Sequence, residues 1–136
     1  MTLGPRSLSE DQMTTTRERL DELCDAFNAH DLDRIMSLFA DGCILEMPRG
    51  DKPWGAWFEG KEAVRAALAT RFSGLPDVHY GDAEHFVDDA AGTGMSKWKL
   101  TGTLSSGKKL EVRGCDFYSF RDGKVIRKDS YWKIVE

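Results

Sequence analysis

The C-terminal half of the chain has the pattern of four strands joined by short turns, and this feature constrains the fold most strongly. Strand-like segments near 78–88, 93–104, 108–121 and 124–135 are separated by clusters of turn residues. The last turn carries Asp122-Gly123 between two alternating segments, which is a strong signal for a hairpin. Four strands linked in this way predict an antiparallel meander.

The N-terminal half carries the periodicity of helices instead. The first helix is marked by four apolar residues at i, i+3, i+4 and i+7, namely Leu20, Leu23, Cys24 and Phe27. Asp31 can cap a second, short helix, and residues 61–72 form a third, with a strand at 43–47 before it. The chain thus begins with helices and ends with a meander, an order that predicts an α+β fold. In this fold three helices pack on one face of a curved, mainly antiparallel sheet around a pocket.

Length and composition bound the class of protein. The 136 residues fit one domain over 13–136, preceded by a mobile N-terminal arm at 1–12. The net charge is -4 with acids and bases interspersed, which speaks against nucleic acid as a partner, and no apolar run is long enough for a membrane span. Three cysteines, an odd number, and the absence of a leader pattern lead us to expect free thiols and a cytoplasmic location.

Alternation along the strands predicts which side chains face the helices. The expected inner wall combines Trp98, Asp116, Tyr118, Lys128 and Trp132. In the last strand Ile126, Lys128 and Ser130 would face inward and Val125, Arg127 and Asp129 outward, although one bulge would exchange Asp129 and Ser130. The outer face would carry Lys97, Lys99, Arg113, Arg127 and Lys133, which argues against a large hydrophobic interface but not against a dimer.

Asp116 is the foremost catalytic candidate. A carboxylate among apolar neighbours loses hydration, so we expect its pKa to rise and the group to donate a hydrogen bond or exchange a proton near neutral pH. The alternative is a structural aspartate satisfied by a tyrosine, a tryptophan or backbone N–H groups.

A second group of candidates lies in the last strand and in the aromatic loop. Asp129 is a second catalytic candidate, with Lys128 and Tyr131 as possible ligand contacts, against the alternative of an exposed edge. Trp54 and Trp57 lie in the loop 49–60 and either cover a flat ligand or close the core.

Metal and cofactor motifs lack the required spacing. His79 and His85 would lie on the same face of one strand but roughly 20 Å apart, too far to share an ion, so we predict no metal. Gly102 to Lys108 resembles a phosphate-binding loop, but Lys109 replaces the Ser or Thr that binds magnesium and a strand follows, so we predict no nucleotide cofactor.

Three segments of the sequence resemble the nuclear transport factor two-like superfamily, in its SnoaL-like and ketosteroid-isomerase-like branch. They are "FNAHDLDRIMSLFADGCILEMP" at 27–48, "FEGKEAVRAAL" at 58–68 and "CDFYSFRDGKV" at 115–125. The resemblance implies a cone, with a strongly bent sheet wrapped around a long helix and a pocket inside. It also implies homodimers formed through the outer sheet face.

The resemblance carries over to some site residues only. Ketosteroid isomerases combine a tyrosine, a protonated aspartic acid and an aspartate base. The protonated acid corresponds to Asp116, whereas the base position before Pro48 is Met47 and the tyrosine position falls near Leu23. SnoaL-like cyclases and related epoxide hydrolases use an acid in the last strand, a position that here holds Ser130.

These observations predict a pocket protein for a small hydrophobic molecule. One hypothesis is a SnoaL-like isomerase or cyclase-type lyase that acts on a hydrophobic carbonyl compound by acid–base chemistry at Asp116. The alternatives are a binding module without turnover and a protein-interaction or assembly domain of the same fold.

Overall fold

A computed structural model describes residues 15–136, so the arm predicted at 1–12 lies outside the described residues. The helices are α2 (Thr16–Asn28), α3 (Leu32–Ser37) and α4 (Lys61–Gly74). The strands are β1 (Phe39–Glu46), β2 (Trp57–Glu59), β3 (His79–Asp88), β4 (Thr93–Thr103), β5 (Lys109–Arg121) and β6 (Lys124–Trp132). The four strands predicted for the meander and the α+β class are confirmed.

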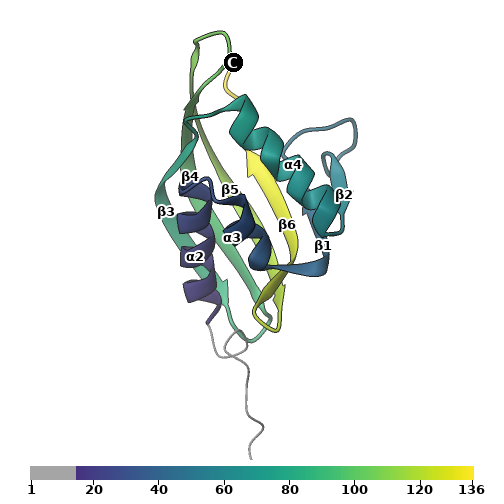
Figure 1. The fold of residues 1–136 in the computed structure, drawn as a ribbon. Helices are drawn as coiled ribbons and strands as arrows, with labels where there is room; N and C mark the ends of the chain where they lie inside the picture. The colour runs from purple at the N-terminus through teal and green to yellow at the C-terminus, as the bar shows by residue number, and fades with distance from the viewer. Residues whose placement is uncertain (1–14) are drawn as a thin grey trace, which may run out of the picture.

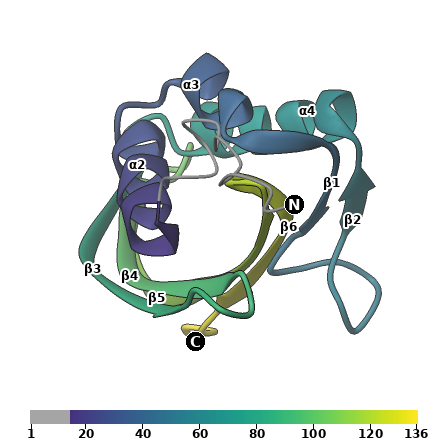
Figure 2. The same cartoon turned by 90° about the horizontal axis from the view of Figure 1, so that it is seen from below.

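The strands form one six-stranded sheet in the order β2-β1-β6-β5-β4-β3, in which all neighbours are antiparallel except β1 and β6. The sheet bends so strongly that β3, β4, β5 and β6 curve around α2 (Figure 2). Helix α4 crosses the β1 and β6 side of the same concave face (Figure 1). The cone expected from the resemblance is therefore present, and its interior lies between α2, α4 and the sheet.

Helix α2 is fixed at both ends by side chains. At its start the Thr15 hydroxyl accepts a hydrogen bond from the Glu18 N–H at 3.1 Å, which satisfies one of the free donors of the first turn. At its end the Asn28 amide donates to the Tyr80 carbonyl and accepts from the Tyr80 N–H, at 3.0 and 2.8 Å. These contacts attach α2 to β3 and hold its apolar face, with Leu20, Leu23 and Phe27, against the sheet.

The alternation predicted for β5 is confirmed. Val112, Asp116 and Tyr118 are buried on the concave face, whereas Arg113 and Phe117 are exposed on the convex face. Burial of the apolar members of this set stabilises the cone in proportion to the area that they remove from water.

One part of the register in β6 was predicted wrongly. Ser119 pairs with Arg127 but Phe120 pairs with Val125, so Ile126 is the extra residue of a bulge. Val125 is therefore buried in the core, and Ile126 turns to the convex side. Because the bulge precedes Lys128, it leaves Lys128 and Ser130 facing inward and Asp129 facing outward.

The structure also corrects two element boundaries. Strand β1 begins at Phe39, four residues before the predicted start, because α3 already ends at Ser37. The segment 49–60, predicted as a loop, ends in the short strand β2, which pairs with β1.

Across residues 15–136, no helix has the length and apolar character that a membrane crossing requires.

Candidate functional site

Four buried polar side chains meet on the concave face of β4, β5 and β6. One carboxylate oxygen of Asp116 accepts a hydrogen bond from the Trp98 indole N–H at 3.0 Å. The other accepts from the Lys128 ammonium at 3.0 Å and from the Ser130 hydroxyl at 2.5 Å. The Lys128 ammonium also donates to the Ser130 oxygen at 2.8 Å. We call these residues the Asp116 cluster.

The strand pairing explains why the cluster forms. Asp116 lies directly opposite Ser130 across β5 and β6, and Lys128 follows Ser130 by two residues on the same face. Trp98 reaches the other carboxylate oxygen from β4. The Lys128 ammonium also lies 5.4 Å from the Phe27 ring and 5.9 Å from the Tyr118 ring, so aromatic faces surround the charge.

The contacts of Asp116 are those of a hydrogen-bond acceptor. We expected a carboxylic acid among apolar groups that would donate a hydrogen bond. In the structure both oxygens accept hydrogen bonds, and one of the donors is the Lys128 ammonium. Asp116 is therefore placed to accept a proton, and Lys128 is the group placed to polarise a ligand oxygen.

The interior of the cone contains two small cavities, both lined by Asp116, Trp98, Phe27 and Tyr80. The first, of about 10 Å³, reaches the Lys128 and Ser130 side of the cluster, and the second, of about 20 Å³, lies towards α2. Each volume is close to the space needed by one water molecule. The interior is therefore filled mainly by side chains, with room for a ligand only if some of them move.

The first cavity is covered by Arg71 of α4 and Trp132 of β6, together with Met47, Pro48 and Leu68. The Arg71 guanidinium stacks over the Trp132 ring at 4.5 Å. A long, flexible arginine on a ring that is itself only partly buried forms a cover that can move without disturbing the strands.

Two tyrosine hydroxyls face the same interior. Burial raises the pKa of Tyr80 and of Tyr118, and the negative charge of Asp116 raises both further. Both hydroxyls therefore remain protonated at neutral pH, so they are available as hydrogen-bond donors.

Four of the candidates predicted from the sequence lie away from this interior. Asp129 is on the convex face of β6 and accepts a hydrogen bond at 2.9 Å from Tyr131, whose side chain is 59% exposed. Trp54 and Trp57 are 51% and 45% exposed and line neither interior cavity. These four side chains line neither interior cavity, whereas Trp98, Tyr118, Lys128 and Trp132 do line the interior.

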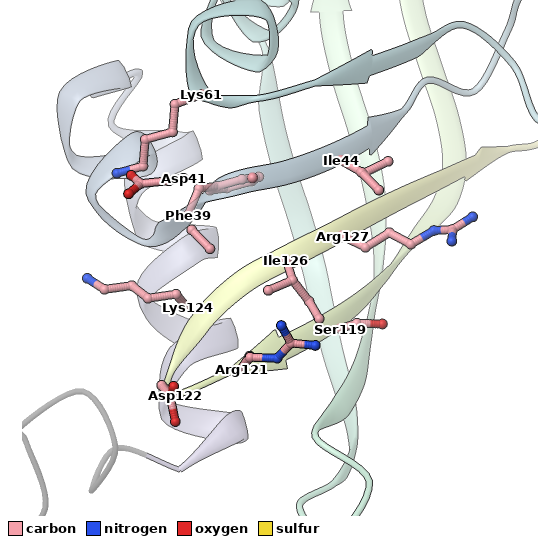
Figure 3. Close-up of a pocket in the computed structure, with 12 residues that line it drawn as sticks. Phe39, Asp41, Ile44, Lys61, Ser119, Arg121, Asp122, Lys124, Ile126 and Arg127 are labelled. Carbon is pink, nitrogen blue, oxygen red and sulfur yellow. The ribbon is translucent and has the colours of Figure 1, made fainter.

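A further hollow lies on the opposite side of the sheet. It is an open groove of about 750 Å³ between β1 and β6, where the strand pairing shifts between Phe39 and Ile44. Basic and acidic side chains alternate around its apolar floor of Ile44 and Ile126 (Figure 3). The groove contains none of the Asp116 cluster, and its mixed charges do not converge on one point, so we assign the candidate site to the interior.

Sequence reasoning missed three contributors to the site. Ser130 was predicted to face inward, but its hydrogen bond to Asp116 was not. Arg71 gave no sequence signal, because a basic residue in the last turn of a helix usually serves that helix alone. Ser96, opposite Asp116 on β4, could have been found from the strand register.

In residues 15–136 no three His, Cys, Asp or Glu side chains are grouped to hold a metal ion.

Solved structures share this fold at low sequence identity. A protein from Pseudomonas putida KT2440, provisionally named a polyketide cyclase, is 16% identical with a TM-score of 0.80, covering 89% of this chain and 93% of its own. A phenazine biosynthesis-related protein from Pseudomonas aeruginosa is 15% identical with a TM-score of 0.77, covering 95% and 83%. An NTF2-like protein of unknown function from Exiguobacterium sp. 255-15 is 20% identical with a TM-score of 0.72, covering 86% and 99%.

No curated protein matches the sequence. The model of the SnoaL-like domain, in contrast, matches residues 20–128, which include Trp98, Asp116 and Lys128 of the Asp116 cluster. With the cone established by its geometry, the chain belongs to the SnoaL-like domain family.

Proposed function

We propose that the protein binds a small hydrophobic carbonyl compound inside the cone and acts on it by acid–base chemistry. The observation that supports this proposal is the Asp116 cluster, in which a proton acceptor and a cation lie side by side among aromatic rings. Ketone and enone ligands require this pairing, because their reaction removes a proton next to a carbonyl and places negative charge on the oxygen.

The chemistry assigns a different step to each residue. Asp116 takes a proton from the carbon beside the carbonyl, and the C–H electron pair becomes the double bond of an enolate. Lys128 stabilises the enolate oxygen: an ammonium has three donors, and only two are used by Asp116 and Ser130 among the described residues. With a β,γ-unsaturated ketone the product is a dienolate, and return of the proton to its γ-carbon completes an isomerisation.

Ligand entry requires a change at the cover of the first cavity. The space beside the cluster is about 10 Å³, far below the volume of a ring compound. We propose that Arg71 and Trp132 move apart on binding, which exposes the cluster to the ligand. Removal of the cover in an Arg71→Ala variant is then expected to speed association.

A thermal-shift and exchange experiment with 2-tetralone, a flat hydrophobic ketone, tests the proposal. Ligand that binds only the folded state raises the melting temperature, and NMR in D₂O follows the loss of its α-protons. We expect both effects in the parent protein and a loss of exchange in Asp116→Asn. Lys97→Met serves as a control because Lys97 is exposed on the convex face.

The outcomes separate the alternatives. A thermal shift without α-proton exchange would favour a binding module. If a panel of hydrophobic ketones gives neither a thermal shift nor exchange, the proposal is contradicted and an interaction domain is favoured.

We also propose a cytoplasmic location, because the three free cysteines in residues 15–136 fit a reducing compartment.

The convex face supports a second candidate function, assembly with a second copy of this chain. A single cross-strand row runs over all six strands and contains exposed aromatic side chains at both ends and near its middle. Its members are Phe86, Met95, Phe117, Asp129, Glu46 and Trp57. Phe86 and Phe117 are 50% and 46% exposed, so the row offers apolar surface that a second copy can cover.

We propose that this row is the centre of a homodimer interface. Self-association is favoured because the row is apolar at Phe86 and Phe117 and carries both acidic and basic groups near Trp57, so a two-fold arrangement can match unlike charges. Analytical ultracentrifugation is expected to show a dimer that Phe117→Lys converts to a monomer. A parent protein that sediments as a monomer at high concentration would contradict this proposal.

A further inference from the structure

A second chain of hydrogen bonds connects the interior of the cone with the surface beneath α2. His85 of β3 lies between Asp21 of α2 and Ser96 of β4: its Nε2 is 3.0 Å from the Asp21 carboxylate, and its Nδ1 is 2.9 Å from the Ser96 hydroxyl. The side chains of His85 and Asp21 are 8% and 64% exposed, and Ser96 is 7% exposed. The chain therefore runs from solvent at Asp21 to the buried hydroxyl of Ser96.

The inner end of this chain reaches the candidate site. Ser96 and Asp116 are direct partners across β4 and β5, and both line the second cavity. That cavity, of about 20 Å³, has the volume for one water molecule, which can bridge the Ser96 hydroxyl and the Asp116 carboxylate.

The hydrogen-bond roles follow from Asp21. A carboxylate only accepts, so Nε2 of His85 carries the proton that it donates to Asp21. In the neutral ring Nδ1 is then an acceptor, and the Ser96 hydroxyl donates to it. The lone pairs of the Ser96 oxygen remain available on the cavity side.

We propose that Asp21, His85 and Ser96 form a proton relay between the Asp116 cluster and solvent. The inference rests on the proposed function: isomerisation returns the proton to the ligand, but exchange of the ligand's α-protons with D₂O requires Asp116 to exchange its proton with solvent from inside a closed cavity. Asp116 returns the proton to the cavity water, the water protonates the Ser96 oxygen, and Ser96 passes its own proton to Nδ1 of His85. The resulting imidazolium pairs with Asp21 and releases the Nε2 proton at the surface.

The geometry excludes a nucleophilic role for the same three residues. Acyl transfer by a serine, a histidine and an aspartate needs a carbonyl carbon held against the serine oxygen. Ser96 faces a space of about 20 Å³ that Leu20, Leu23 and Tyr118 enclose, so an ester group has no room there. In the relay the serine oxygen exchanges protons only, for which one water is sufficient.

Charged and titratable groups line the relay from α2 and β5. Asp21 and Cys24 belong to α2, and Tyr118 and Asp116 lie across the cavity on β5. Of these, Asp21 is in direct contact with the ring. The relay therefore depends on His85 itself, which makes His85 the residue to change.

The test compares the parent protein with His85→Gln, which keeps one donor and one acceptor but does not transfer protons. The first readout is hydrogen exchange of the Trp98 indole N–H, which donates to Asp116 and is followed by NMR without any ligand. We expect exchange to slow by about tenfold or more in His85→Gln, at an unchanged unfolding midpoint. Ser96→Ala is expected to behave in the same way, and Ser96→Thr to restore the parent rate.

The second readout is α-proton exchange of 2-tetralone. His85→Gln is expected to lower its rate by about 10²-fold, a usual contribution of a proton-transfer group, while the thermal shift on binding stays the same. If the parent protein exchanges no ketone protons, the proposed function fails and the indole readout alone decides on the relay. Equal indole exchange in the parent, His85→Gln and Ser96→Ala would overturn the relay, as would ¹⁵N shifts that place the proton on Nδ1.

Discussion

Removal of one partner of the buried Lys128–Asp116 ion pair should destabilise the fold strongly. The ammonium and carboxylate are 3.0 Å apart, and the two side chains are 7% and 8% exposed. At this separation an effective dielectric constant of about 20 gives an attraction of about 5.5 kcal/mol. Leaving one buried charge without its partner costs about 3–5 kcal/mol, so we expect Lys128→Met and Asp116→Leu each to lower the free energy of unfolding by that amount.

Urea denaturation followed by tryptophan fluorescence measures these changes. A double-mutant cycle is required, because each single variant also leaves Ser130 and Trp98 with altered hydrogen bonds. We expect the double variant to be destabilised by far less than the sum of the singles, because it leaves no unpaired charge in the cone. Lys97→Met, the same change at an exposed position on the convex face, should cost within about 0.5 kcal/mol.

Two results would refute this reasoning. If Lys128→Met costs no more than Lys97→Met, the ammonium is adequately hydrated in the folded protein and the pair is not a buried one. If the double variant loses the full sum of the two single changes, the residues act independently. Either result would remove the electrostatic basis of the Asp116 cluster.

Three further predictions concern other parts of the fold. Gly114→Ala should cost about 1–3 kcal/mol in urea denaturation, because a Cβ there would collide with the Trp98 ring and with the backbone of β6; an unchanged midpoint would contradict it. Asn28→Ala should cost about 2–4 kcal/mol, since both backbone groups of Tyr80 lose their partner; a loss below about 1 kcal/mol would show that water replaces the amide. Burial and a neighbouring carboxylate raise the pKa of Glu46 above its ordinary value. The folded state therefore holds its proton to higher pH than the unfolded chain does, so the contribution of Glu46 to stability falls as pH rises above about 4.5. The Glu46→Gln variant should show a smaller fall of the melting temperature with pH, in melting curves recorded between pH 4 and 7.

Most of the fold could be predicted because its signals are local. The strand alternation in β5 placed Asp116 and Tyr118 on the concave face, and the Asp-Gly turn set the start of β6. The bulge at Ile126 could not be predicted, because it depends on how β6 fits between two neighbours rather than on its own residues. Strand β2 was missed for a related reason: three residues form a strand only because β1 offers an edge.

The candidate site was predicted in position but not in chemistry. Periodicity places Asp116, Lys128 and Trp98 on one face, yet it does not show that they bond to one another. The bonds depend on the register between strands. That register places Ser130 of β6 opposite Asp116 on one side and Ser96 of β4 opposite Asp116 on the other side. Residues from different elements, such as Arg71 over Trp132 and Asp21 beside His85, are visible only once the helices are packed.

The energetics of the Asp116 cluster connect its structure with its function. Replacing a buried ion pair by apolar groups of similar volume is often neutral, or stabilising by about 1–4 kcal/mol, so stability alone does not require a charged pair in the cone. The Asp116→Leu/Lys128→Met variant therefore separates the two roles. If it folds as stably as the parent protein and no longer shifts with 2-tetralone, the pair serves the ligand. If it binds 2-tetralone as before, the pair is structural, and the interaction face on the convex side becomes the better account of the protein.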